Sequence, residues 1–158
     1  MLGVSLASFN ALPADEAVSA MLDCCASRRF AGAMAAGRPY PSSAALITAV
    51  CTAFESLTWD DILEAMDGHP RIGDRVSGQS AAEQSGVGDA SRHALADANS
   101  AYEARFGHVF LICATGLSGS QMLSAHQERM ENDPSSERAV ATAELEKITV
   151  LRARKAFG

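Results

Sequence analysis

Helix start and stop signals recur along almost the whole chain, and they constrain its fold more than any other feature. Pro13 precedes acidic residues that suit the first turn of a helix, and Gly37 precedes the run RPYP, which cannot continue one. Further helices would begin at the capping residues Ser42, Thr58 and Ser118. We therefore expect helices over residues 13–25, 28–37, 42–57, 58–68, 89–106, 118–132 and 135–157.

The run HVFLICA at residues 108–114 is the apolar stretch that does not match a helix. Its β-branched and aromatic residues favour a strand, but a lone strand has no partner with which to form a sheet. We expect an irregular buried segment near residues 108–116. The fold class that follows is all-α, a single-domain bundle of about seven or eight helices over residues 1–158.

Length, charge and hydropathy exclude several classes of protein. A chain of 158 residues with 47% hydrophobic content has the usual size of one domain and can bury a substantial core. With a net charge of -6 and scattered basic residues, the sequence shows no basic patch of the kind that binds nucleic acid. The most apolar windows are far shorter than the ~20 residues that span a bilayer, and neither end carries a leader or a peroxisomal signal. We expect no membrane contact and a place in the cytoplasm of a bacterium.

The cysteine pattern indicates ordinary buried thiols. Cys24 and Cys25 are adjacent, Cys51 and Cys113 stand alone in apolar segments, and no CxxC pair occurs. This pattern favours neither a zinc knuckle nor a thioredoxin-like redox site. We expect all four thiols to be buried in a reducing cytosol.

Familiar catalytic motifs are missing from the sequence. The histidines at 69, 93, 108 and 126 form no HxH, HxxxH or HExxH pattern, so we expect no metal site. The chain also has no P-loop lysine and no GxSxG elbow. Phosphate transfer and serine hydrolysis are therefore excluded as interpretations.

The stretch DGHPRIGD at residues 67–74 places a histidine between a glycine and a proline. Gly68 can close the preceding helix, and Pro70 pushes the residue before it out of the helical region. His69 should therefore lie off the helix, on a stiffened turn. Either this turn only ends the helix, or it also directs the imidazole of His69 into a cavity.

Two further polar groups have both a structural and a functional interpretation. Ser80 with Glu83 three residues later matches a capping box, a common helix start, although the pair could also belong to an active site. Arg152 lies on the same predicted helix face as Leu145 and Ile148. An arginine there usually extends its charged end to solvent, but it can also bind an anion.

The sequence resembles the OHCU decarboxylase family, which acts on 2-oxo-4-hydroxy-4-carboxy-5-ureidoimidazoline in urate breakdown. The resemblance runs almost from end to end. The blocks that carry it are SRRFAGAMAAGRPY, DGHPRIGD, SAAEQSG, NSAYEARFGHVFLICATG and ERAVATAELEKITVLRARKAF.

The resemblance implies a cofactor-free decarboxylase that forms (S)-allantoin, with His69 as the principal acid/base residue and Glu83 beside it. Family substrate contacts would map onto one turn, one loop, one apolar segment and one arginine. These residues are Pro70, Ser80, Ala81, Ala82, Glu83, Gln84, Phe110, Leu111, Ile112, Cys113, Ala114 and Arg152. Irregular backbone at Phe110–Ala114 would leave N–H and C=O groups for a flat polar ligand.

The resemblance also implies partners. It suggests a homodimer that works beside urate oxidase and hydroxyisourate hydrolase. Two departures from the family pattern, His108-Val109 after Phe-Gly and the pair Gly86 and Gly88, leave pocket polarity open. The alternatives are a decarboxylase of a related ureido or imidazoline acid and a non-catalytic all-α binding module.

Overall fold

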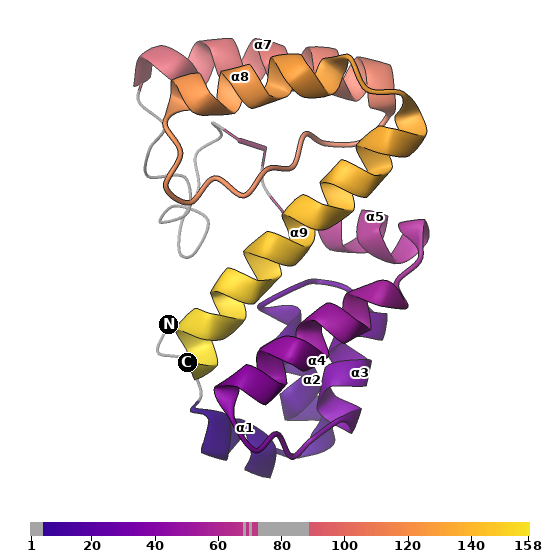
Figure 1. The fold of residues 1–158 in the computed structure, drawn as a ribbon, viewed down its shortest axis with the longest axis vertical. Coiled ribbons are helices and arrows are strands. Elements are labelled where there is room, and N and C mark those ends of the chain that lie inside the picture. Colours follow the sequence, from indigo (N-terminus) through magenta and orange to yellow (C-terminus); the bar gives the residue numbers. More distant parts are fainter. Residues whose placement is uncertain (1–4, 68, 70, 73–88) are drawn as a thin grey trace. The chain divides into compact units, whose positions relative to one another are not determined.

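The computed structural model describes residues 5–67, 69, 71–72 and 89–158, with the side chains of 89 and 90 excepted (Figure 1). The chain divides into two compact units. The first, here called the N-terminal unit, comprises Met1–Gly68 and Leu145–Gly158, and the second, the central unit, comprises His69–Glu144. Each unit is described by itself below. A single domain over residues 1–158 stays a prediction.

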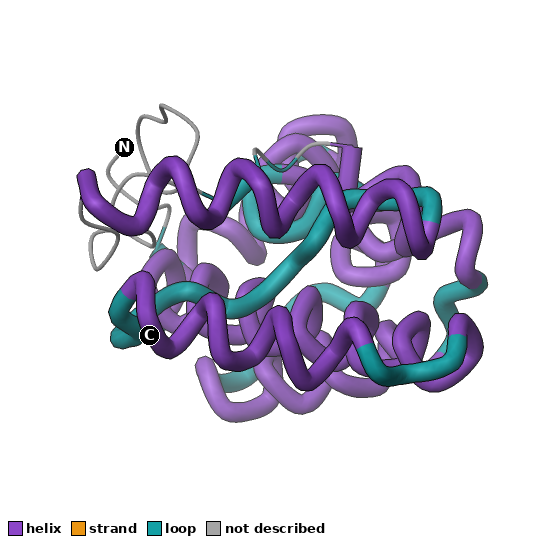
Figure 2. The backbone as a smooth tube through the Cα atoms, turned by 90° about the horizontal axis from the view of Figure 1, so that it is seen from above, coloured by secondary structure: helices purple, strands orange, loops and turns teal. Residues whose placement is uncertain are grey.

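The all-α prediction is confirmed: the described residues form eight helices and no strand (Figure 2). The N-terminal unit holds α1 to α5 and the end of α9, whereas the central unit holds α7, α8 and the start of α9. The bounds are α1 Leu6–Ala11, α2 Ala14–Leu22, α3 Arg28–Ala36, α4 Ser43–Glu55, α5 Trp59–Asp67, α7 Asp89–Phe106, α8 Gly119–Met130 and α9 Pro134–Phe157.

The predicted helix caps are confirmed in the structure. Ser42 accepts a hydrogen bond from the N–H of Ala45, and Ser118 forms a reciprocal capping box with Gln121. Thr58 and Asp61 cap α5 in the same reciprocal way, with distances of 2.9 Å and 3.3 Å between side chains and backbone N–H groups. Side-chain caps therefore begin these helices where the sequence predicts.

Helix α1 was not predicted. It has six residues and no acidic residue in its first turn, so it lacks most of the signals used to recognise a helix. Its N-cap is Ser5, whose hydroxyl accepts from the N–H of Ser8. Arg38 stabilises the other end, because its guanidinium donates to the carbonyls of Phe9 at 2.9 Å and Leu12 at 2.6 Å. These contacts span some thirty positions and cannot be read from the local sequence.

An apolar core runs through the N-terminal unit. Helices α2 and α3 pack together, and α3 also packs on α4. Phe9 lies against Phe157 with ring centroids 5.1 Å apart, and Phe30 meets Phe54 edge-on at 5.6 Å. The side chains of the last turns of α9 thus complete the core formed by the first helices.

The central unit has a core of its own, here called the central cluster. Its helices α7 and α8 lie side by side (Figure 1). The cluster collects apolar side chains from the turn after α5, from α7 and α8, and from the segment between them. Its buried members are Ile72, Leu95, Tyr102, Phe110, Ile112, Ala114 and Met122.

The prediction of four buried cysteines is wrong for two of them. Cys24 and Cys25 are buried as expected, but Cys51 is exposed and Cys113 is half-buried. Cys51 lies on α4, whose buried face is formed by Leu46, Val50 and Phe54, and position 51 falls off this face. A cysteine within an apolar stretch of sequence can therefore still face solvent, when it lies on the exposed side of its helix.

No helix in the described part of the chain is long and apolar enough to cross a membrane.

Candidate active site

His69 lies where the sequence predicts, off the helix and in a bend two residues after the end of α5. Its side chain is half-buried. Ile72 follows three residues later and belongs to the central cluster, together with Phe110, Ile112 and Ala114. Three residues span at most about 11 Å. His69 is therefore tethered within that distance of the core against which the apolar segment packs.

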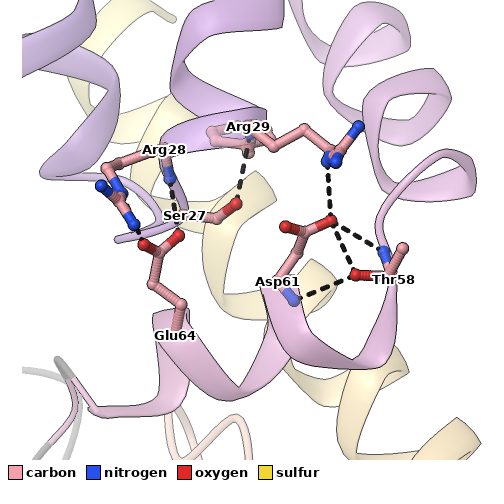
Figure 3. A network of polar contacts seen from close by, with 7 residues as sticks. Ser27, Arg28, Arg29, Thr58, Asp61 and Glu64 are labelled. Atoms are coloured by element: carbon pink, nitrogen blue, oxygen red, sulfur yellow. Dashed lines mark hydrogen bonds and ion pairs between the residues drawn. The ribbon is translucent and has the colours of Figure 1, made fainter.

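Helix α5, which ends just before His69, is tied to the start of α3 by two ion pairs (Figure 3). The carboxylate of Glu64 accepts from both the N–H and Nε of Arg28, at 3.0 Å and 2.7 Å. The Asp61 carboxylate lies 2.9 Å from Nε of Arg29. The pKa of Asp61 is lowered, first by the backbone N–H of Thr58 and then by its other donors. Each contact is exposed, so their contribution to the position of α5 is modest.

Half of the predicted substrate contacts lie outside the described residues. This applies to Pro70 and to the whole run from Ser80 to Gln84 with Glu83, so neither the capping-box nor the active-site interpretation of Glu83 is tested. Gly86 and Gly88 also lie there.

The predicted irregular segment is confirmed between α7 and α8. Gly107 ends α7 with a φ of +79°, and Gly116, with a φ of +81°, leads into the turn before α8. Left-handed backbone of this kind favours glycine. Between them Phe110, Leu111, Ile112 and Ala114 are buried, and Cys113 is half-buried. A non-helical backbone with buried side chains crosses the central unit, as the sequence predicts.

Side chains of this segment alternate in their packing. Phe110, Ile112 and Ala114 enter the central cluster, whereas Leu111 and Cys113 do not. A period of two is the signature of an extended chain. Polar groups of residues 111 and 113 then point to one edge of the segment, and those of 110 and 112 point to the other.

Two charged side chains hold the edge formed by residues 111 and 113. Nη1 of Arg129, on α8, donates to the carbonyl of Leu111 at 2.6 Å. The carboxylate of Glu144, on α9, accepts from the N–H of Cys113 at 3.1 Å. On the opposite edge, no described residue accepts a hydrogen bond from the N–H of Phe110 or Ile112. Among the described residues, the segment is thus held from the edge of residues 111 and 113.

Arg129 is the centre of a buried polar network that sequence reasoning missed. It is 6% exposed, and Glu137 beside it is 0% exposed. Nε of Arg129 donates to Oε1 of Glu137 at 2.7 Å, and Nη2 lies 2.5 Å from the same oxygen without being aligned for a hydrogen bond. Tyr102 and Asn132 add hydrogen bonds to the carboxylate at 2.5 Å and 3.0 Å. Every side-chain oxygen of this buried carboxylate therefore has a donor.

Aromatic rings enclose the network. The guanidinium carbon of Arg129 lies 4.6 Å from the ring centroid of Phe110 and 5.7 Å from that of Tyr102. Burial, and then the hydrogen bond to Glu137, raise the pKa of Tyr102 far above its ordinary value. Its hydroxyl therefore stays protonated and acts as a donor at neutral pH.

A sequence signal for Arg129 existed. Met122, His126 and Arg129 follow the i, i+4, i+7 spacing of one helix face, and all three are buried. A similar one-face spacing, i, i+3, i+7 from Leu145 and Ile148, singled out Arg152 on the last helix. A second arginine on an apolar helix face was therefore readable, but its partner Glu137 was not, because the pairing depends on the turn between α8 and α9.

Arg152 lies in the N-terminal unit and is half-buried on α9. Leu145 and Ile148, its predicted companions, are buried. The positive charge of Arg152 acts on Cys24 and Cys25, where it partly opposes the rise in pKa that burial produces. Arg152 thus reaches buried surroundings within its unit rather than lying on the open surface.

His108 joins the aromatic group of the central unit. Its ring meets Tyr102 edge-on at 5.4 Å and lies 6.2 Å from Phe106. Nδ1 lies 3.1 Å from the carbonyl of Val109, which can only accept, so Nδ1 is the donor in this contact. His108 therefore helps to pack the start of the irregular segment.

Comparison with known proteins yields one family and several relatives. The family model described as OHCU decarboxylase matches residues 10–154. The uric acid degradation bifunctional protein TTL of Arabidopsis thaliana is 37% identical over 146 residues, or 85% of this chain. The chain spans 45% of the length of that protein. A 2-oxo-4-hydroxy-4-carboxy-5-ureidoimidazoline decarboxylase of Amia calva is 30% identical over 135 residues, covering 77% of this chain and 76% of the relative.

Two solved structures have the same fold. A crystal structure of OHCU decarboxylase in the presence of (S)-allantoin aligns with a TM-score of 0.74 and 38% identity, over 86% of this chain and 95% of that one. A crystal structure of (S)-allantoin synthase aligns with a TM-score of 0.72 over 98% of this chain and 54% of that one. Its identity of 20% supports a likeness of fold alone.

Proposed function

Because the chain belongs to the OHCU decarboxylase family, we propose that it decarboxylates 2-oxo-4-hydroxy-4-carboxy-5-ureidoimidazoline to (S)-allantoin in urate breakdown. The observation that carries the proposal is the likeness to the OHCU decarboxylase structure with (S)-allantoin, which extends over nearly all of that chain. An exposed-groove binding module without catalysis is disfavoured, because the family match covers residues 10–154.

The reaction can proceed without an organic cofactor. The bond between ring carbon C4 and its carboxylate breaks, and the electron pair passes into the neighbouring C=N of the ring, which acts as the electron sink. One proton is then taken up at the neighbouring ureido-bearing carbon, while the 4-hydroxyl gives its proton to the ring nitrogen and becomes the carbonyl of allantoin, so that atoms and charge balance. A stereospecific enzyme must deliver that proton to one face of the ring. The protein therefore needs to orient the carboxylate and to place one acid/base group.

His69 suits the acid/base role in the proposal. An imidazole changes its charge state near neutral pH and can both accept and donate a proton. Its position in a bend, tethered to the central cluster through Ile72, supports a side chain held in place rather than free on the surface. Glu83 would act beside it on the 4-hydroxyl of the substrate, as the family resemblance implies.

The apolar segment would bind the flat polar ring. A ureido-imidazoline presents several N–H and C=O groups around its edge, and a binding site must match them. The edge formed by Phe110 and Ile112 would offer such groups from a buried stretch of the segment. Pro70 and the run Ser80–Gln84 would complete the contacts. Arg152 would bind the carboxylate or another anionic edge through its planar guanidinium.

The proposal extends to the enzymes that act beside this one, to its oligomeric state and to its location. The substrate is unstable, so the enzyme would act beside urate oxidase and hydroxyisourate hydrolase, which generate it. The relative in Arabidopsis thaliana, named for two activities in uric acid degradation, supports such coupling. We further propose a homodimer in the cytoplasm, which size-exclusion chromatography with light scattering would test.

A kinetic experiment tests the activity. Urate oxidase and hydroxyisourate hydrolase would generate the intermediate from carbon-labelled urate, and nuclear magnetic resonance would follow its carboxyl carbon. The expected result is loss of that carbon as CO2 at a rate proportional to the concentration of this protein. A rate equal to that of the mixture without the protein would overturn the proposal. A related ureido acid would then be the next substrate to assay.

A further inference from the structure

The contacts that hold the Leu111 and Cys113 edge of the segment include a deeply buried ion pair, Arg129 with Glu137. Such burial is unusual for a purely structural contact. Arg129 and Glu137 are among the most buried charged residues of the central unit. Burying an ion pair is costly, and an apolar replacement of similar volume is often as stable or more so. Stability alone therefore gives weak grounds for an arginine at this place.

The geometry gives the arginine a task that an apolar residue could not perform. One guanidinium joins the Glu137 carboxylate, through Nε, to the Leu111 carbonyl, through Nη1. Phe110 lies under the same group. The planar fork thus sets the orientation of the peptide group after Leu111, and Glu144 sets that of the peptide group before Cys113.

These two peptide groups flank Ile112. In an extended chain, setting the groups of residues 111 and 113 toward one edge turns the N–H and C=O of Ile112 toward the other. We propose that Arg129, fixed by Glu137, and Glu144 are positioning residues that aim the backbone of Ile112 at the substrate. This inference rests on the proposed function and deepens it, because it explains what orients the backbone groups of the binding edge.

The test compares KM with kcat for paired variants. Arg129→Lys keeps the charge, but a single ammonium cannot reach both the carboxylate and the carbonyl in the planar geometry of the fork. We expect KM to rise at least tenfold with kcat reduced less than threefold. Arg105→Lys is the matched control, since Arg105 also donates to a backbone carbonyl, that of Asn132 at 2.7 Å, but is exposed. Its KM should stay within twofold of wild type.

A second pair keeps the inference testable if Arg129→Lys does not fold. Glu144→Leu removes the acceptor for the Cys113 N–H, whereas the amide oxygen of Glu144→Gln can still accept it. We expect a fivefold or larger rise in KM for the leucine variant and recovery to within twofold for the glutamine variant. A structural role alone would reduce the folded fraction, and thus the apparent kcat, without raising KM.

The outcomes distinguish failure of the proposed function from failure of the positioning role. A wild-type chain without decarboxylase activity would overturn the proposed function together with this role. Active wild type with an unchanged KM in Arg129→Lys or, should that variant not fold, in Glu144→Leu would overturn the positioning role while leaving the proposed function in place.

Discussion

At the scale of single residues, the proposed chemistry concentrates on His69 and Glu83. The sequence predicted the position of His69 because glycine and proline act locally on the backbone. It could not predict the anchoring of the Leu111 carbonyl by Arg129, since that contact depends on how α8 packs against the irregular segment. Local signals thus singled out His69, whereas tertiary contacts determine the groups that hold the irregular segment.

Removing the acid/base groups should slow the reaction without unfolding the chain. We expect His69→Ala and Glu83→Gln each to reduce kcat by about 10² or more, the usual scale for such a group. His93→Ala is the matched control, because its imidazole is 92% exposed and lies 3.9 Å from the carboxylate of the exposed Asp97. Steady-state kinetics in the coupled assay would measure all three. Near wild-type turnover in Glu83→Gln would favour the capping-box interpretation, because glutamine also serves there.

The buried thiols of the N-terminal unit predict a loss of stability in alkali. Burial raises the pKa of Cys24 to about 12 and that of Cys25 to about 11, from the ordinary thiol value of 9.0. Below pH 9 the thiols are protonated in both the folded and unfolded states, and their contribution is fully present. Above pH 9 the unfolded thiols ionise while the folded ones keep their protons, so the free energy of unfolding falls.

Urea denaturation at pH 8 and pH 10 would measure this effect. At pH 10, one unit above the unfolded pKa, each thiol should cost on the order of 1 kcal/mol of stability. The double variant Cys24→Ala/Cys25→Ala should be less stable at pH 8, because two small cavities replace the sulfur atoms, but it should lose less between pH 8 and pH 10. An equal loss in wild type and variant would show that other groups titrate instead.

At the scale of helices and segments, caps were more predictable than contacts between elements. Ser42, Thr58 and Ser118 were read from residues within one turn of each helix start. Helix α1 was missed because Arg38, far along the chain, satisfies its last carbonyls. The irregular segment was predicted by elimination, whereas the alternation of its side chains into the central cluster depends on tertiary packing.

Because α7 and α8 pack closely, we expect that replacing Gly119 by alanine lowers the stability of the chain instead of raising it. A Cβ on Gly119 would lie 2.4 Å from Cβ of Ser91 and 2.2 Å from its Oγ, so the two helices would have to move apart. Alanine is the better helix former by about 1 kcal/mol, but the clash should outweigh this gain. We expect Gly119→Ala to lower the stability by roughly 1–3 kcal/mol.

Gly32→Ala on α3 is the control for this substitution. Nothing lies within 4 Å of a Cβ built at that position, so only the helix propensity changes. We expect it to stabilise the chain by about 0.5–1 kcal/mol. Thermal unfolding followed by far-ultraviolet circular dichroism would compare both variants with wild type. A stabilising Gly119→Ala would contradict the described packing of α7 on α8.

At the scale of the whole chain, the proposed site draws on residues from position 69 to position 152. Sequence patterns alone gave the all-α class and singled out His69, Glu83 and Arg152, while the family resemblance united them in one reaction. Their mutual geometry could not be predicted, because the placement of residues so far apart in sequence depends on tertiary contacts that local patterns do not encode. The polar network around Glu137 shows the same limit, since its donors come from Tyr102, Arg129 and Asn132 on separate segments.

The most direct test of the central claim is circular dichroism of allantoin formed from urate by urate oxidase and hydroxyisourate hydrolase, with and without this protein. Spontaneous decay of the intermediate gives racemic allantoin and no lasting signal. The account predicts a growing (S)-allantoin signal whose rate is proportional to the concentration of the protein and is lost in His69→Ala. A signal identical to that of the mixture without the protein would contradict it.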